Sequence, residues 1–262
     1  HFEKFIHTAK LFDFIFTTDA NMIGKYKEIT KNNNVFAMSF SAEPKLHNPI
    51  KLDEERIEKI CFAGSYYGNR HEDRRRDMEE ILDIAAKFGL DIYDRNYERN
   101  KHGKTDFSFP ERFTENVKGR LRYNEIDKAY KGYKVMLNVN SVKNSPTMFS
   151  RRVFEGLACG TPIISSYSMG IKKTFKDIVL ISENKEELVK NVEKLMDDED
   201  YYRQKSLEGI REVFLNHLYK HRLKFIFDNI GIKTVDEEKT VSVLSVVKSK
   251  EEFEEILVSF NS

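Results

Sequence analysis

The stretch MFSRRVFEGLACGTPIISS, residues 148–166, decides how this chain folds. It predicts a loop, a short helix, a glycine stop and then a buried apolar strand. Three small residues, Gly156, Ala158 and Gly160, favour a helix that lies close against a sheet. Gly160 suits the left-handed position that ends a helix, and Pro162 blocks its continuation. The stretch therefore indicates one helix–strand unit of an α/β fold.

The start of this predicted helix combines features that favour a bound anion. Ser150, Arg151 and Arg152 come together there, so free backbone N–H groups, the positive end of the helix dipole and two guanidinium groups share one place. Glu155 lies one turn further on, where it can accept hydrogen bonds from sugar hydroxyls. An anion site beside a sugar site indicates a nucleotide sugar, which carries both a diphosphate and a ribose.

The rest of the chain alternates between short apolar segments and helical patterns. We expect strands at 12–18, 35–40, 60–63, 90–93, 135–139, 163–165 and 178–181, and helices at 20–30, 71–88, 124–130, 185–196, 200–217 and 218–229. This alternation predicts an α/β fold, a Rossmann-like parallel sheet with helices on both faces. Ligands of such sheets bind at the carboxyl ends of the strands, where Gly64, Arg95 and the loop before Arg151 can converge.

Composition narrows the class of protein. The chain has 262 residues, of which 40% are hydrophobic and 33% charged, and its net charge is only +1. This charge gives no reason to expect a nucleic-acid or membrane partner. No apolar run approaches the roughly 20 residues of a membrane span, and we expect a cytoplasmic protein. Cys61 and Cys159 fall in predicted core elements, so two reduced, buried thiols are expected rather than a disulfide or a catalytic thiol.

At the opening stretch the resemblance to a known family becomes specific. The pattern that runs from Arg151 through Phe154, Glu155 and Gly160 to Pro162 resembles the donor-site signature of GT-B glycosyltransferases of the family 4, or group 1, type. It resembles the CgeB-like branch most. Further pieces follow the family order at residues 60–65, 117–123 and 130–138. The resemblance extends from about residue 12 to about residue 230.

The resemblance implies the C-terminal, donor-binding half of a GT-B enzyme. Residues 1–45 would be a remnant of the acceptor half, 46–235 the nucleotide-sugar-binding domain, and 236–262 a linker and the start of a further domain. The implied reaction transfers a hexosyl group from a nucleoside diphosphate sugar, with UDP-sugar as the first choice, to a hydroxyl of a glycan, cell-surface polymer or protein. It needs no metal and no cofactor, and the family member would be bacterial.

The candidate site residues combine those derived from the pattern with those implied by the family. The catalytic candidates are Arg70, Arg151 and Glu155; the donor-binding candidates are Gly64, Ser65, Tyr67, Tyr93, Arg95, Tyr123, Thr147, Met148, Phe149 and Ser150. Thr147 stands where many family 4 enzymes have the first glutamate of an E-x7-E pair. No metal site is predicted, because His217 and His221 lack a nearby third ligand in the sequence.

Several alternatives stay open at this point. Arg70 can be a solvated residue of a plain turn, Tyr93 and Tyr123 can be structural, and Glu155 can simply pair with Arg151 at i, i+4. Residues 74–76, a run of three arginines, are interpreted as a solvated helix face. Residues 241–247 with the helix-like 249–259 either begin another domain or form a last strand–helix pair packed on this one. The alternative function is a non-catalytic module that binds a nucleotide sugar or scaffolds a larger glycosyltransferase.

Overall fold

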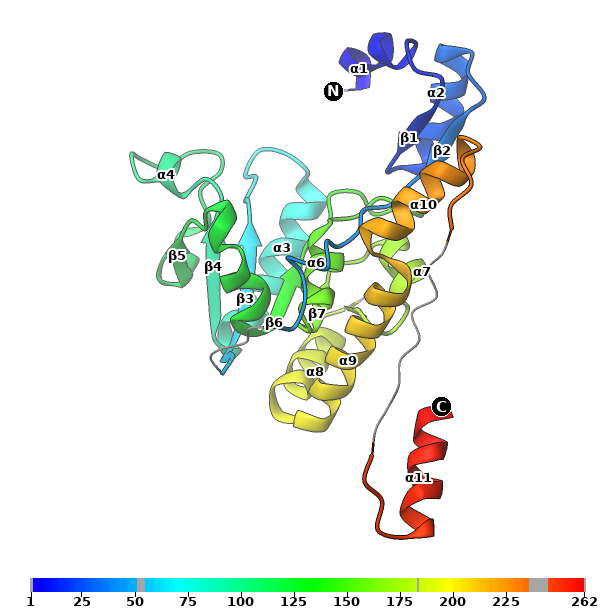
Figure 1. The fold of residues 1–262 in the computed structure, drawn as a ribbon. Helices are drawn as coiled ribbons and strands as arrows, with labels where there is room; N and C mark the ends of the chain where they lie inside the picture. The colour runs from blue at the N-terminus through cyan, green and yellow to red at the C-terminus, as the bar shows by residue number, and fades with distance from the viewer. Residues whose placement is uncertain (1, 51–54, 183, 236–244, 262) are drawn as a thin grey trace.

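The computed structural model describes residues 2–50, 55–182, 184–235 and 245–261. Its centre is a six-stranded sheet in which every neighbouring pair is parallel, in the order β5-β4-β3-β6-β7-β8 (Figure 1). The strands are β3 (Ile57–Gly64), β4 (Leu90–Asp94), β5 (Val117–Gly119), β6 (Tyr133–Asn138), β7 (Ile163–Ser165) and β8 (Leu180–Ile181). The predicted Rossmann-like parallel sheet is therefore confirmed.

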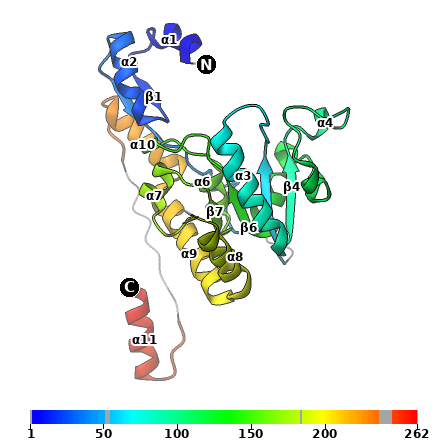
Figure 2. The same cartoon turned by 180° about the vertical axis from the view of Figure 1, so that it is seen from behind.

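Helices cover both faces of this sheet, and each face has its own apolar core (Figures 1 and 2). One core is formed by α3 (Glu72–Ala85) and α8 (Lys185–Asp197) against the sheet. The other is formed by α5 (Asp127–Lys131), α6 (Arg152–Ala158), α7 (Met169–Phe175) and α9 (Glu199–Asn216). Shorter elements complete the domain: η2 (Ala86–Phe88), α4 (Tyr97–Asn100), η3 (Glu111–Asn116) and η4 (Tyr123–Glu125).

Helix α6 lies as close to the sheet as its small residues predict. A Cβ atom on Gly156 would come within 2.5 Å of Met136 Cε and 3.2 Å of Ile163 Cδ1, so any larger residue would require these side chains to shift. Gly160 has φ +74° and follows the end of the helix. A residue with a side chain would be strained in this left-handed conformation. These two glycines fix the position of α6 against β6 and β7.

A second, smaller sheet precedes the main one in the chain. Strands β1 (Ile15–Thr17) and β2 (Val35–Ala37) pair in parallel, and they are shorter than the sequence predicts. They are joined by η1 (Ala20–Met22) and α2 (Ile23–Thr30), while α1 (Phe2–Ala9) comes first. Helix α10 (Tyr219–Asn229) crosses to this sheet, where Phe225 packs edge-on to Phe16 and Phe36. Helix α10, which follows the main sheet in the chain, therefore packs against the N-terminal β1–β2 sheet.

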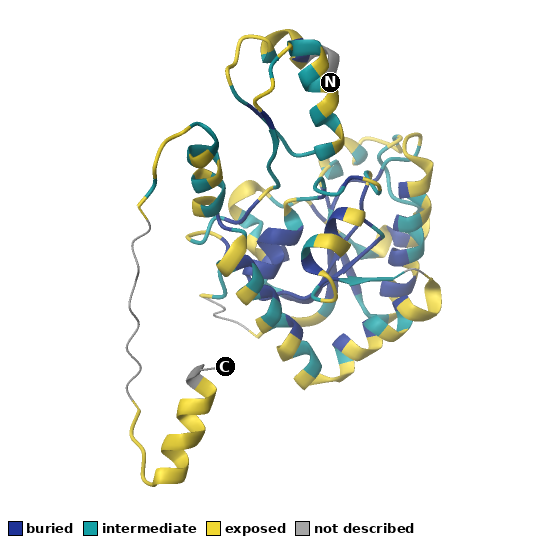
Figure 3. Ribbon diagram, turned by 90° about the vertical axis from the view of Figure 1, so that its right-hand side faces the viewer, coloured by how far each residue is buried: buried dark blue, intermediate teal, exposed yellow. Residues whose placement is uncertain are grey.

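The last helix, α11 (Lys250–Asn261), is exposed along residues 251–259 (Figure 3). Phe253, on its apolar side, is 50% exposed. The interpretation of a strand–helix pair packed on the main domain is therefore wrong for the helix. The strand expected at 241–247 lies mostly outside the described residues, and the three described residues at its end form no strand.

Candidate functional site

A cavity of about 290 Å³ opens at the carboxyl ends of β3, β4 and β6. The chain turns to opposite sides of the sheet after β3 and after β6, which makes this the switch point where doubly wound sheets bind ligands. We call it the arginine cavity. Its lining residues are Phe40, Gly64, Ser65, Tyr67, Arg74, Arg95, Val139, Asn140, Ser141, Val142, Met148, Phe149, Ser150 and Arg152.

Three guanidinium groups and no carboxylate line the arginine cavity. Arg74 comes from α3, Arg95 follows β4 and Arg152 begins α6. Among the described residues, none of the three forms an ion pair with an acidic side chain. Guanidinium groups keep their charge at any ordinary pH. The cavity therefore carries an uncompensated positive charge that a bound anion would neutralise.

Arg152 is the most firmly held of the three. Its guanidinium donates to the Ala63 carbonyl at 2.5 Å and to Asn138 Oδ1 at 3.3 Å, and it lies over the Phe62 ring. Burial lowers the pKa of Arg152. Gly64 makes room for this arrangement, because a Cβ there would lie 2.7 Å from Phe62 Cζ and 3.3 Å from Arg152 Nη2.

The interpretation of residues 74–76 as a solvated helix face is wrong for Arg74. Its residue is 8% exposed, and its guanidinium donates to the Ser65 carbonyl at 3.1 Å and lies over the Tyr67 ring. Arg76 does face solvent and pairs with Asp73 at 3.1 Å. The helical spacing carried the signal: Arg74 precedes the buried Met78 by one turn, on the same side of α3.

Seven of the predicted donor-binding residues line the arginine cavity: Gly64, Ser65, Tyr67, Arg95, Met148, Phe149 and Ser150. Other candidates lie elsewhere. Arg70 is exposed in the loop before α3, and Tyr123 is 79% exposed. The Tyr93 hydroxyl bonds that of Tyr133 at 2.9 Å, at the sheet itself. The roles assigned to Arg70, Tyr93 and Tyr123 stay predictions.

Glu155 lies in a closed group beside the cavity, which we call the Glu155 cluster. Its carboxylate accepts a 2.5 Å hydrogen bond from Tyr130, and it lies 3.4 Å from Arg151 Nε and 3.8 Å from His47 Nε2. Glu155 is buried, whereas the Arg151 side chain is 63% exposed. The i, i+4 pairing that the sequence left open is thus present. Arg152 feels the charge of Glu155 electrostatically, so the cluster adjoins the cavity wall.

Thr147 binds the N-terminal segment rather than lining the cavity. Its hydroxyl donates to the Thr18 carbonyl at 2.8 Å and accepts from the Ala20 N–H at 2.9 Å. Ser145 Oγ accepts a hydrogen bond from the Met148 N–H at 3.0 Å, which holds the backbone of Met148 in place. The loop that enters the cavity is therefore anchored on the segment that follows β1.

A buried amide network lies beneath Arg152, and the sequence analysis missed it. Asn138 accepts from Arg152 and donates to Asn140 Oδ1 at 3.0 Å and to Ser165 Oγ at 2.9 Å. Asn140 Nδ2 donates to the Ser166 carbonyl at 2.8 Å. Two asparagines so close together at a strand end, after the three apolar residues 135–137, were the available signal.

Two other kinds of site to consider among the described residues are a metal centre and a reactive thiol. Within residues 2–50, 55–182, 184–235 and 245–261, no three His, Cys, Asp or Glu side chains are grouped to hold a metal ion. Cys61 and Cys159 are buried and form no disulfide, as predicted. Burial raises the pKa of Cys159 to about 12, so its thiol stays protonated. Among the described helices, none combines the length and the apolar character needed to cross a membrane.

This architecture is that of the Rossmann-like domain of GT-B glycosyltransferases. The sequence pattern of the family described as "Glycosyl transferase-like" matches residues 74–228, more than half of the chain, so the chain belongs to this family. No curated protein sequence matches it.

Solved structures support the same fold. Sucrose-phosphate synthase from Thermosynechococcus elongatus superimposes with a TM-score of 0.59 at 17% identity, over 87% of this chain and 62% of that chain. A glycosyltransferase from Rickettsia africae superimposes with a TM-score of 0.59 at 12% identity, over 87% of this chain and 67% of that chain. Anabaena HepE, solved in complex with UDP and glucose, has a TM-score of 0.59 at 10% identity, over 87% of this chain and 66% of that chain. This chain thus spans about two thirds or less of these chains' length.

Proposed function

We propose that the protein transfers a hexosyl group from a nucleoside diphosphate sugar, with UDP-sugar as the first choice, to a hydroxyl acceptor. The observation that carries the proposal is the arginine cavity. Arg74, Arg95 and Arg152 line it without any carboxylate, at the switch point of a glycosyltransferase fold. A diphosphate supplies two or more negative charges and oxygen acceptors that match the fork of donors on each guanidinium.

The chemistry of transfer explains why such a cavity is useful. The donor bond breaks as the diphosphate leaves, and negative charge grows on its bridging oxygen while the anomeric carbon becomes oxocarbenium-like. Fixed positive groups aimed at the leaving oxygen lower this barrier, because they need not reorganise during the reaction. In our proposal the three arginines supply this charge, and no divalent cation is required.

Glu155 and Arg151 have a proposed role next to the diphosphate. The ribose of the donor would lie toward the Glu155 cluster, where the carboxylate accepts hydrogen bonds from its hydroxyls in place of Arg151 or His47. The contacts of Glu155 with Arg151 and His47, at 3.4 and 3.8 Å, are longer than its 2.5 Å hydrogen bond from Tyr130. A ribose would therefore replace Arg151 or His47, while Tyr130 would keep the carboxylate in position. Arg151 is exposed enough to turn toward the donor.

The finer assignment rests on sequence similarity and on the relatives. The pattern from Arg151 to Pro162 supports a CgeB-like member of the family, in a bacterial and cytoplasmic setting. The complex of HepE with UDP and glucose supports UDP as the nucleotide and a hexose as the transferred group. The proposed acceptor is a hydroxyl of a glycan, a cell-surface polymer or a protein.

A thermal-shift screen tests the proposal. UDP, GDP, ADP and their hexose conjugates should raise the melting temperature because they bind only the folded state, and UDP should do so most. The Arg152→Lys variant should lose most of this shift, whereas Arg76→Ala should keep it. If no nucleoside diphosphate raises the melting temperature, the proposal is wrong.

The alternative, a module that binds nucleotide sugar without transfer, is favoured by one observation. Thr147 stands where many family members have an acidic residue, and its hydroxyl is bonded to Thr18 and Ala20 after β1. Proton NMR of the protein with UDP-glucose separates the two functions. The enzyme should slowly convert the donor to UDP, with free glucose formed when water is the acceptor and a glucosylated product formed when glycan is added, and a binding module should leave the donor intact.

A further inference from the structure

A second cavity lies beside the arginine cavity and has a different chemical character. It measures about 370 Å³ and is bounded by α3 and by the segments that follow β6, β7 and β8. We call it the α3–β8 pocket. The polar side chains that matter here are Asp77, Glu80, Lys143, Ser166, Tyr167 and Ser182.

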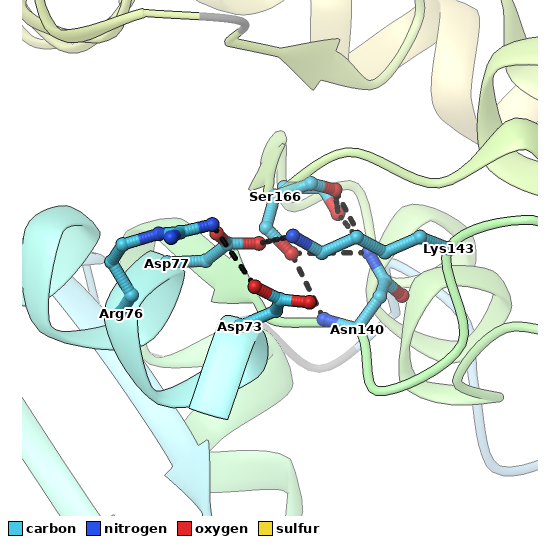
Figure 4. Close-up of polar contacts among 7 residues, drawn as sticks. Asp73, Arg76, Asp77, Asn140, Lys143 and Ser166 are labelled. Atoms are coloured by element: carbon cyan, nitrogen blue, oxygen red, sulfur yellow. Dashed lines mark hydrogen bonds and ion pairs between the residues drawn. The ribbon is translucent and has the colours of Figure 1, made fainter. Parts of the chain in front are cut away.

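The charges of the α3–β8 pocket are partly compensated. Lys143 Nζ reaches across from its loop to Asp77 Oδ2 at 2.6 Å, while Arg76 pairs with Asp73 on the same helix at 3.1 Å (Figure 4). The second carboxylate of the pocket, that of Glu80, has no hydrogen-bond or ion-pair partner among the described residues. Two carboxylates against one ammonium disfavour a phosphate here, in contrast to the arginine cavity.

Uncharged groups complete the lining. The Tyr167 hydroxyl also has no partner in the described part of the chain, and its ring is half-buried at the pocket. Ser182 contributes a second hydroxyl, and Ile81 and Leu188 form an apolar wall. Carboxylate and hydroxyl groups that face an apolar wall match a sugar, which presents hydroxyls at its edge and C–H groups on its face.

The two cavities share a wall. Asn140 lines the arginine cavity, and its Nδ2 donates to the carbonyl of Ser166, which lines the α3–β8 pocket. On α3, Arg74 faces one cavity, while Asp77, one turn later, faces the other. A ligand in the α3–β8 pocket would therefore be a close neighbour of the donor.

We propose that the α3–β8 pocket is a carbohydrate-binding subsite that takes a neutral sugar residue of the acceptor glycan, with Glu80 and Tyr167 bonded to its hydroxyls. Its assignment to the acceptor, though not the sugar binding itself, rests on the proposed function. A neutral sugar fits better than an anion, because the pocket has more carboxylates than cations. It fits better than a metal ion, because the described residues offer no group of three ligands.

Saturation-transfer NMR with methyl glycosides tests the proposal on the full chain. The probes are the methyl glycosides of glucose, galactose, mannose and N-acetylglucosamine at millimolar concentration, with and without excess UDP. At least one should give a saturation-transfer signal that UDP does not remove. The double variant Glu80→Gln with Tyr167→Phe should reduce this signal at least fivefold.

The matched control is Glu193→Gln with Tyr219→Phe, which makes the same chemical changes at exposed positions away from the pocket and should keep the signal. If the double variant melts early, Glu80→Gln alone serves and should weaken the signal at least twofold. Three results would overturn the proposal: no glycoside signal, a signal that UDP displaces, or a signal that survives the pocket variants. Titration of the same samples with UDP reports on the proposed function separately.

Discussion

Helix α6 contributes to two neighbouring regions that treat charge in opposite ways. Arg152 enters the arginine cavity, where no carboxylate is part of the lining. Glu155, one turn later, enters the Glu155 cluster, where Tyr130, Arg151 and His47 surround its carboxylate. Partners offset much of the cost of burying a charge, whereas a buried charge without an ion-pair partner keeps that cost until a ligand arrives. This difference in charge balance favours binding of an anionic ligand at the arginines. Glu155, in contrast, can bind a ligand only by giving up one of its present partners.

The largest expected effect is at Arg152. Arg152→Ala should weaken nucleoside diphosphate binding at least about 30-fold, about 2 kcal/mol, because it removes a desolvated charged partner of the ligand. Arg152→Lys should recover part of this loss, since it restores the charge without the planar fork. Titration calorimetry measures both, with circular dichroism to verify folding. Equal affinity in Arg152→Ala and the wild type would place the diphosphate elsewhere.

The next effect sharpens the comparison at the Glu155 cluster. Glu155→Ala should weaken nucleoside diphosphate binding about tenfold, about 1.4 kcal/mol, through the lost ribose contact, and should also lower the melting temperature. Tyr130→Phe removes the 2.5 Å hydrogen bond to Glu155 but no proposed ligand contact. It should lower the melting temperature and weaken affinity much less than Glu155→Ala does, because the carboxylate itself stays available to the ribose. If Glu155→Ala behaves like Tyr130→Phe, the glutamate only supports the fold.

A smaller effect is expected on α3, where two arginines two residues apart provide a matched pair. Arg74→Ala should weaken nucleoside diphosphate binding about fivefold, about 1 kcal/mol, because Arg74 lines the cavity. Arg76→Ala, whose side chain is 70% exposed and paired with Asp73, should change affinity little. Calorimetry at two salt concentrations measures the difference. Similar losses in both variants would mean that α3 acts only through its overall charge.

The sequence predicted the sheet and several residues that line the candidate cavity at its carboxyl edge, because both depend on local sequence. The motif around Gly156 and Gly160 specifies how α6 meets the sheet, and apolar strands specify the parallel order. It predicted only part of the site, because side-chain direction depends on tertiary packing. Arg151 and Arg152 are neighbours in sequence, yet one is exposed and the other turns inward onto Phe62. No local pattern distinguishes them.

The smallest effect concerns pH and the His47 side of the Glu155 cluster. Burial lowers the pKa of His47 from its ordinary value near 6.5, although Glu155 opposes this. Below that value the unfolded chain takes up a proton that the folded chain does not, so the free energy of unfolding falls as the pH falls. His47→Gln should make the decrease in melting temperature between about pH 7.5 and 5.5 shallower. An unchanged or steeper decrease would mean that His47 is not held neutral by burial.

The central claim, that arginines rather than a metal ion hold the donor diphosphate, is tested most directly by calorimetric titration of the wild-type protein with UDP in EDTA and in Mg²⁺. Fixed guanidinium groups need no divalent ion, so the account predicts a dissociation constant that agrees within about threefold between the two buffers, about 0.7 kcal/mol. A loss of more than about tenfold in EDTA, or no binding in either buffer, would contradict it.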